Sequence, residues 1–120
     1  MSLTLTAGQI VLMNSRDALP NEPGRLRPCV VIEDPDLFGD GYANVIVVPL
    51  THDRMASFSL VMTTIDPTPD NGCDDRSYAL AAHVASYSRN RIVNATESRI
   101  TDEQLANIRA QVALALTYDG

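Results

Sequence analysis

Runs of valine, isoleucine and other apolar residues recur along the first two thirds of the chain and predict β-strands. Continuous β-branched runs of this kind are typical of strands that are buried on both faces. Five such segments lie between stretches rich in turn-forming residues, at Gly8–Met13, Pro28–Ile32, Val45–Leu50, Leu60–Ile65 and Tyr78–Val84. The pattern therefore predicts a mostly β protein, which we expect to be an antiparallel barrel of five to seven strands.

The connections between these segments are marked by proline, glycine, asparagine and aspartate, which favour turns and resist regular structure. Residues 14–26 hold two prolines, two asparagines and a glycine, and residues 33–42 are expected to form a hairpin loop. The stretch 66–75 contains two prolines, an Asn-Gly pair and four acidic residues, which predicts an exposed loop.

The hydrophobic period changes near the C-terminus, where the pattern predicts one helix at about Thr101–Leu116. Thr101 and Gln104 have the spacing of a capping box, and two acidic residues follow Thr101 in the first turn, where the helix dipole favours anions. Four apolar residues then fall on one face at helical spacing, namely Leu105, Ile108, Val112 and Leu116. The expected architecture is a small antiparallel barrel with a C-terminal α-helix packed on it.

Length and composition limit the protein to one domain, covering residues 1–120. At 13.0 kDa, with 45% hydrophobic residues, the chain has an ordinary globular composition. It has no apolar run of about 18 residues, and its N-terminus lacks a basic leader followed by an apolar block. We therefore expect a cytoplasmic location, in which Cys29 and Cys73 stay reduced.

The charge balance is acidic, with a net charge of −6 and a pI near 4.6. This balance argues against broad, non-specific nucleic-acid binding. All nine basic residues are arginine, and the planar fork of arginine suits phosphate oxygens better than the point charge of lysine. The absence of lysine is also typical of the codon use of a GC-rich genome.

Four segments together resemble the MazF/PemK toxin family over nearly the whole chain. Gly8–Val11 matches the first strand of that family, and Glu22–Val31 matches its Glu-x-x-Gly loop followed by Arg-Pro and an apolar strand. Val48–Thr51 matches its Pro-Leu-Thr segment, and Ser77–Ile92 matches its last conserved stretch. The combination of Arg-Pro with Pro-Leu-Thr about two dozen residues later is more specific than any one piece.

This resemblance implies an SH3-like barrel, a homodimer whose RNA groove crosses the subunit interface, and a cognate antitoxin protein as partner. The implied activity is metal-independent endoribonuclease cleavage of single-stranded messenger RNA at short specific sequences. No cofactor is implied. The sequence likewise shows no Cys, His or acidic residues at the spacing of metal ligands.

The resemblance also implies catalytic residues, of which Arg27 and Thr51 match the family's site. In metal-free RNA cleavage the ribose 2′-hydroxyl attacks phosphorus, and a guanidinium aimed at the phosphorane stabilises its additional charge. Thr51 would donate to a phosphate oxygen or to the ribose. Glu22 matches an acidic loop residue that acts as a base or orients substrate, and His52 is a natural proton-transfer group. Each of the four has an ordinary surface role as its alternative.

RNA-binding positions follow from the same resemblance. His83 takes the place of a family glutamine and either lines the groove or is a partly buried core histidine. A basic residue of the family is replaced by Ala85, for which Arg89 and Arg91 are possible substitutes. The expected RNA contacts are Arg25, His83, Ser86 and Arg89.

Two other functions are compatible with the expected fold. A non-catalytic relative would act by binding a protein, as the CcdB-type gyrase poisons do, but their C-terminal tryptophan has no counterpart here because the chain contains none. An SH3-like adaptor for proline-rich peptides needs an aromatic groove, and only 5% of the residues are aromatic.

Overall fold

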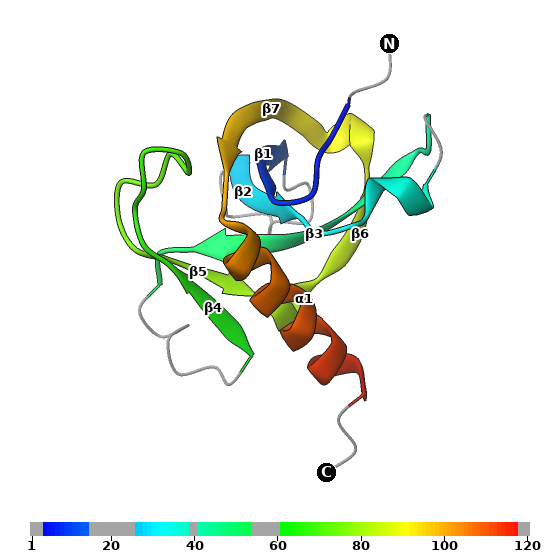
Figure 1. Ribbon diagram of the computed structural model, residues 1–120. Helices are drawn as coiled ribbons and strands as arrows, with labels where there is room; N and C mark the ends of the chain where they lie inside the picture. The colour runs from blue at the N-terminus through cyan, green and yellow to red at the C-terminus, as the bar shows by residue number, and fades with distance from the viewer. Residues whose placement is uncertain (1–3, 15–25, 39–40, 54–60, 118–120) are drawn as a thin grey trace, which may run out of the picture.

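The computed structural model describes residues 4–14, 26–38, 41–53 and 61–117. These residues form seven strands followed by one α-helix, with three short 3₁₀-helices between them (Figure 1). The strands are β1 (Gln9–Asn14), β2 (Leu26–Val31), β3 (Asn44–Thr51), β4 (Met62–Ile65), β5 (Ser77–Leu80), β6 (Ala85–Ser88) and β7 (Ile92–Arg99). The helices are η1 (Pro35–Leu37), η3 (Ala81–His83), η4 (Arg89–Arg91) and α1 (Asp102–Thr117).

The strands form one antiparallel sheet in the order β4-β5-β3-β2-β1-β7, with β6 paired to the first half of β3. The centre of the sheet is β3, which pairs with β2 on one edge and with β6 and then β5 on the other. Because β4 and β7 are the two ends of this order, the barrel is partly open in the described part of the chain. This arrangement confirms a mostly β, antiparallel fold with a C-terminal helix.

The first four predicted strands are confirmed, whereas the fifth is wrong in its extent. The strand that starts at Ser77 ends at Leu80, and a 3₁₀ turn over Ala81–His83 replaces the predicted continuation to Val84. Two further strands follow it. The longer of them, Ile92–Arg99, is half polar and carries no continuous β-branched run, so the pattern of apolar residues did not reveal it. It is held instead by pairing with β1, a non-local contact.

Two clusters of buried side chains lie on opposite faces of the central strands, as expected for strands buried on both sides. The first cluster joins β1–β5 to α1 and includes Ile10, Val30, Val48, Leu50, Leu105 and Ile108. The second cluster lies on the other face of β1–β3, against β6 and β7, and includes Val11, Met13, Cys29, Val31, Val45 and Val47. Successive residues of β2 thus belong to different clusters, which follows from the two-residue period of a strand.

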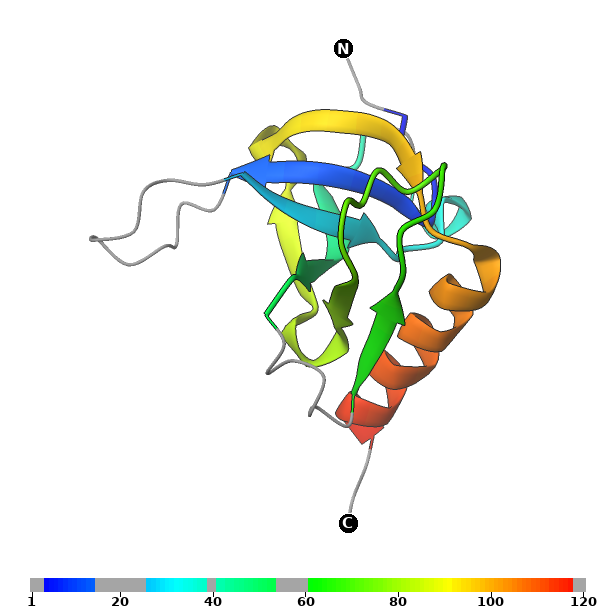
Figure 2. The same ribbon diagram turned by 90° about the vertical axis from the view of Figure 1, so that its left-hand side faces the viewer.

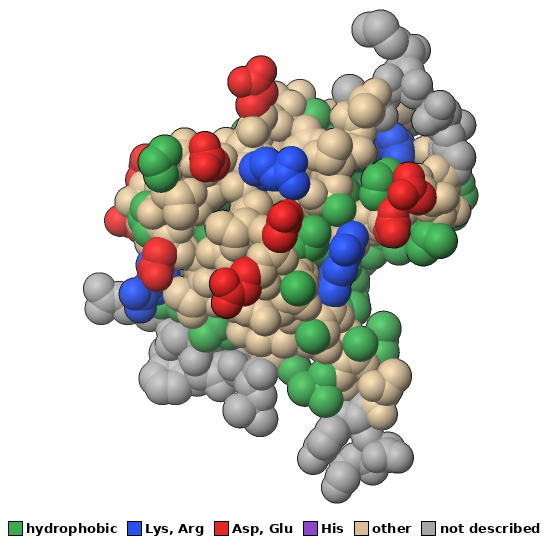
Figure 3. Space-filling view, viewed as in Figure 1, with side chains coloured by type: hydrophobic (Ala, Val, Ile, Leu, Met, Phe, Trp, Pro, Cys, Tyr) green, Lys and Arg blue, Asp and Glu red, His purple; other side chains and the backbone are tan. Residues whose placement is uncertain are grey.

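The capping box at the start of α1 is confirmed. The backbone N–H of Gln104 donates to Thr101 Oγ1 at 3.1 Å, and the backbone N–H of Thr101 donates to Gln104 Oε1 at 3.0 Å. The predicted apolar face is only partly buried, since Leu105 and Ile108 pack in the core but Leu116 is 73% exposed. Figures 1 and 3 show why, because the last turns of α1 extend beyond the sheet and leave hydrophobic side chains on the surface.

Two expectations drawn from composition concern the state of the cysteines and the absence of a membrane-spanning segment. Cys29 and Cys73 are both free thiols, one buried and one half-buried. In the described ranges, no helix is long and apolar enough to cross a bilayer.

Candidate active site

Arg27 is the second residue of β2, where it pairs with Met13 of β1. Its side chain lies on the same face of the strand as that of Cys29, two residues later, and is exposed. Pro28 follows it and restricts the backbone at this position. One small pocket opens beside Arg27, with a volume of about 50 Å³. The Arg27 pocket is lined by Met13, Asn14, Arg27, Cys29, Pro49, Tyr87 and Arg91.

The Arg27 pocket combines an apolar interior with two guanidinium groups. Met13 and Cys29 belong to the second core cluster, against which Tyr87 of β6 packs. The guanidinium carbon of Arg91 lies 5.2 Å from the centre of the Tyr87 ring, within the range of a cation–π contact. None of the described residues that line the pocket is acidic. Two guanidinium groups at one pocket suit the oxygens of a phosphate.

Cys29 contributes a wall to this pocket rather than a nucleophile. Burial raises the pKa of the Cys29 thiol to about 11, although the nearby charge of Arg27 lowers it in part. A raised pKa leaves the thiol protonated at neutral pH, and the thiolate is the reactive form of cysteine. The pocket therefore holds no activated thiol in its described lining.

Thr51 is the last residue of β3. The pairing of β2 with β3 stops at Cys29 and Pro49, two residues short of Arg27 and Thr51. The strands part there, because the end of β3 pairs with β5 instead. Thr51 Oγ1 accepts a hydrogen bond from the backbone N–H of Asp53 at 3.1 Å, which leaves the hydroxyl proton as a donor for a ligand.

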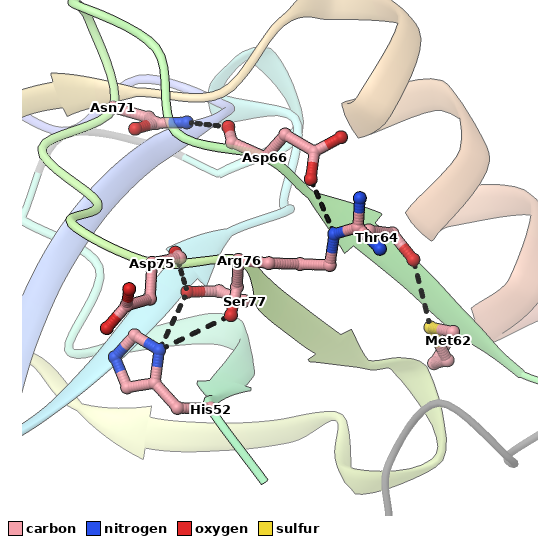
Figure 4. A network of polar contacts seen from close by, with 8 residues as sticks. All are labelled: His52, Met62, Thr64, Asp66, Asn71, Asp75, Arg76 and Ser77. Atoms are coloured by element: carbon pink, nitrogen blue, oxygen red, sulfur yellow. Dashed lines mark hydrogen bonds and ion pairs between the residues drawn. The ribbon is translucent and has the colours of Figure 1, made fainter. Parts of the chain in front are cut away.

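The structure places His52 away from the Arg27 pocket. It follows Thr51 directly, so its side chain points to the other face of the sheet, as adjacent residues of a strand do. There its Nδ1 lies 3.4 Å from Ser77 Oγ and 3.5 Å from the carbonyl oxygen of Arg76 (Figure 4). It lines a second, larger cavity together with residues of the 66–76 loop. Arg27 and His52 are thus not brought together.

The other expected site residues are dispersed. His83 lies in η3 and is exposed, so the alternative of a partly buried core histidine is wrong. Ser86 pairs with Ile46 and, being next to Tyr87, faces away from the Arg27 pocket. The side chain of Arg89 donates from Nε to the carbonyl oxygen of Asn44 at 3.4 Å. Two remaining residues, Glu22 and Arg25, lie outside the described residues.

Two residues of the Arg27 pocket were not among the expected RNA contacts. The sequence indicates Arg91 only as a substitute for the basic residue missing at Ala85, and no motif marks Tyr87. The available signal was weak, since Arg91 lies four positions after Tyr87, across a turn that the sequence did not predict. Of the two arginines near the end of β6, Arg91 rather than Arg89 lines the pocket of Arg27.

Comparison with known proteins gives a family and a fold. The sequence model of the PemK-like, MazF-like toxins of type II toxin–antitoxin systems matches residues 6–116. No protein of the curated collection matches the chain.

Three similar solved structures share the fold at low sequence identity. MazF of Deinococcus radiodurans in a MazE–MazF crystal has a TM-score of 0.76 at 20% identity, covering 98% of this chain and 99% of that one. MazF of the same organism crystallised as Form-I gives 0.70 at 20% identity, over 95% and 97% of the two chains. A mycobacterial endoribonuclease in complex with its cognate antitoxin gives 0.68 at 15% identity, over 98% and 99%.

Proposed function

Since the chain belongs to the PemK-like, MazF-like toxin family of type II toxin–antitoxin systems, we propose that it is a metal-independent endoribonuclease of single-stranded RNA. The observation that carries this proposal is the Arg27 pocket, in which two arginines share an apolar site. The similar mycobacterial protein is itself described as an endoribonuclease.

The proposed reaction needs no group other than RNA and protein side chains. The 2′-oxygen forms a bond to phosphorus while the bond from phosphorus to the 5′-oxygen breaks, giving a 2′,3′-cyclic phosphate and a 5′-hydroxyl end. The 2′-hydroxyl loses its proton to a base, and the 5′-oxygen gains one. The phosphorane in between carries more negative charge than the ground state, so donors aimed at its oxygens lower the barrier.

Arg27 and Arg91 are the groups that we assign to the phosphorane oxygens, with Thr51 donating its hydroxyl proton. Tyr87 fixes the guanidinium of Arg91 through the contact at 5.2 Å, which limits the motion that an exposed arginine would otherwise have. Glu22 remains the candidate base, on the resemblance alone. His52 lines a different cavity, which favours a different task for that residue.

The partners that we propose are a second copy of the chain and a cognate antitoxin. The Deinococcus and mycobacterial relatives described above were both crystallised with an antitoxin. A homodimer would place two copies of the Arg27 pocket along one RNA strand in the cytoplasm.

Expression in a bacterial host separates this function from growth inhibition by protein binding. Induction of the wild-type chain is expected to stop growth and to produce messenger-RNA fragments with 5′-hydroxyl ends, mapped by end-specific ligation and sequencing. Co-expression of the small protein encoded beside the toxin is expected to restore both growth and intact transcripts. Growth arrest with intact transcripts would instead favour a non-catalytic toxin that acts by binding a protein.

A further inference from the structure

A second cavity lies on the reverse side of the strand ends that carry Arg27 and Thr51. It has a volume of about 370 Å³, which is within the range of small-molecule sites, about 300–1,000 Å³. Its floor is apolar and comes from three adjacent strands, with Ile10 and Leu12 on β1, Pro28 on β2 and Leu50 on β3. We call it the His52 cavity.

The His52 cavity begins one residue away from each proposed catalytic residue. Pro28 follows Arg27 and Leu50 precedes Thr51, and consecutive Cα atoms are about 3.8 Å apart. The two strands part at this point, since their pairing stops at Cys29 and Pro49. An RNA strand whose phosphate lies at Arg27 can therefore pass this end of the sheet and place a neighbouring base in the cavity.

One wall of the cavity is the 66–76 loop, which stands in front of β1 and β2 in Figure 2. The buried side chain of Asn71 accepts from the backbone N–H groups of Thr68 and Cys73 at 3.1 and 2.9 Å, and donates to the carbonyl oxygen of Asp66 at 2.8 Å. The loop is thereby stiffened from within. A pre-formed wall lowers the entropy that a ligand loses on binding.

The same loop is fixed to β7. The backbone N–H of Arg99 donates to the carbonyl oxygen of Asp70 at 2.8 Å. Gly72 has a φ of +67° and approaches Ser98 so closely that a Cβ at this position would lie 2.7 Å from Ser98 Oγ. Glycine is therefore required at the point where the wall meets the sheet.

The side chains that line the cavity include a histidine ring and two carboxylates. His52 is held at Nδ1 by Ser77 and Arg76, and Asp75 lies beside its ring in Figure 4. Asp74 and Asp75 both line the cavity. An ionised carboxylate only accepts hydrogen bonds, so these residues repel a phosphate and select a ligand that presents N–H donors.

We propose that the His52 cavity binds an unpaired guanine of the substrate RNA, next to the phosphate that is cleaved. Single-stranded RNA is read by stacking bases on side chains, histidine included, and by hydrogen bonds to their Watson–Crick edges. Guanine presents two adjacent donors, N1–H and the 2-amino group, which match the two oxygens of Asp75. Adenine, cytosine and uracil present no such adjacent pair. The inference rests on the proposed function, because the base belongs to the substrate of that site.

Binding of mononucleotides tests the cavity without any cleavage. Guanosine 5′-monophosphate added to the isotopically labelled wild-type chain is expected to shift the backbone amide signals of Gly72, Asp74 and Asp75 in NMR spectra. Inosine 5′-monophosphate, which lacks only the 2-amino group, and uridine 5′-monophosphate are expected to bind at least about fivefold more weakly, since a good bidentate pair discriminates by that much or more. Equal binding of the three nucleotides would overturn the inference.

Matched variants test which carboxylate is responsible for the preference for guanosine monophosphate. Asp75→Asn replaces one of the two acceptor oxygens by a donor and is expected to remove the preference for guanosine over inosine monophosphate. Asp70→Asn makes the same change in the same loop, at a residue that does not line the cavity, and is expected to keep that preference. A preference unchanged in Asp75→Asn, and also in Asp74→Asn, would contradict the assignment.

Mapping of the cleavage sites in a random RNA library completes the test. Wild type is expected to show guanine enriched beside the cleaved phosphate, and Asp75→Asn is expected to lose this enrichment.

Cleavage with no base enrichment beside the cleaved phosphate would refute guanine binding in the cavity and leave the proposed function standing. Guanosine binding without any RNA cleavage would refute the proposed function and, with it, the assignment of the bound base to a substrate RNA. If N-acetyl-arginine amide shifts these amide signals and guanosine monophosphate does not, the cavity docks a protein side chain, and the inference is wrong.

Discussion

Replacing Arg27 by alanine is expected to lower the rate of RNA cleavage by about a hundredfold or more. The loss of one pre-organised donor to an oxyanion typically costs about 10²–10³ in rate. Arg27 lines the same pocket as Arg91, and from there it would donate to the phosphorane. Single-turnover cleavage of a labelled oligonucleotide measures the effect on the chemical step.

Arg27→Lys separates charge from geometry. Lysine keeps the positive charge but loses the planar fork, so it is expected to recover little of the lost rate. Arg99→Ala is the matched control, because Arg99 lies at the opposite end of β1 and its exposed side chain donates to the carbonyl oxygen of Ala7 at 3.2 Å. Arg109 is less suitable, since its Nε donates to the carbonyl oxygen of Ile32 at 2.9 Å and ties α1 to the sheet. A lysine variant with nearly full activity would contradict the bidentate role.

Replacing Leu105 by alanine is expected to lower the free energy of unfolding by about 2–5 kcal/mol, the usual cost of truncating a buried leucine. Leu105 is 7% exposed and packs in the first core cluster, which joins α1 to the sheet. Because domains of this size have only about 5–15 kcal/mol of stability, such a loss is large. Equilibrium denaturation in urea measures it.

Leu116→Ala is the matched control on the same helix. Leu116 is 73% exposed, and truncating it is expected to change the free energy of unfolding by less than about 0.5 kcal/mol. The apolar period alone assigns both leucines to one face, whereas the structure distinguishes them. Equal destabilisation by the two substitutions would show that the last turn of α1 is covered in solution and that the packing described here is incomplete.

The fold was predictable where local chemistry decides it. The capping residues Thr101 and Gln104 fix the start of α1 through two hydrogen bonds within four residues of chain. The continuous apolar runs of β2 and β3 identify strands that are buried on both faces. The strand Ile92–Arg99 was missed because its pairing with β1 is non-local and its own sequence is half polar.

The site was less predictable, because residues from distant strands assemble it. Arg27 and Thr51 were expected from the family motifs, and the pairing of β2 with β3 stops two residues short of them. Tyr87 and Arg91 enter the pocket only through the pairing of β6 with β3, which no local pattern reveals. The separation of His52 from Arg27, by contrast, follows from the alternation of side chains along a strand, since His52 is adjacent to Thr51.

Cleavage by the purified wild-type chain in the presence of EDTA is the most direct measurement of the proposed function. The protein is incubated, free of antitoxin, with a library of single-stranded RNA sequences, and the ends of the products are identified by mass spectrometry. The expected result is cleavage at a limited set of sequences, leaving 2′,3′-cyclic phosphate and 5′-hydroxyl ends. A folded, antitoxin-free protein that cleaves no member of the library under these conditions would contradict the proposal.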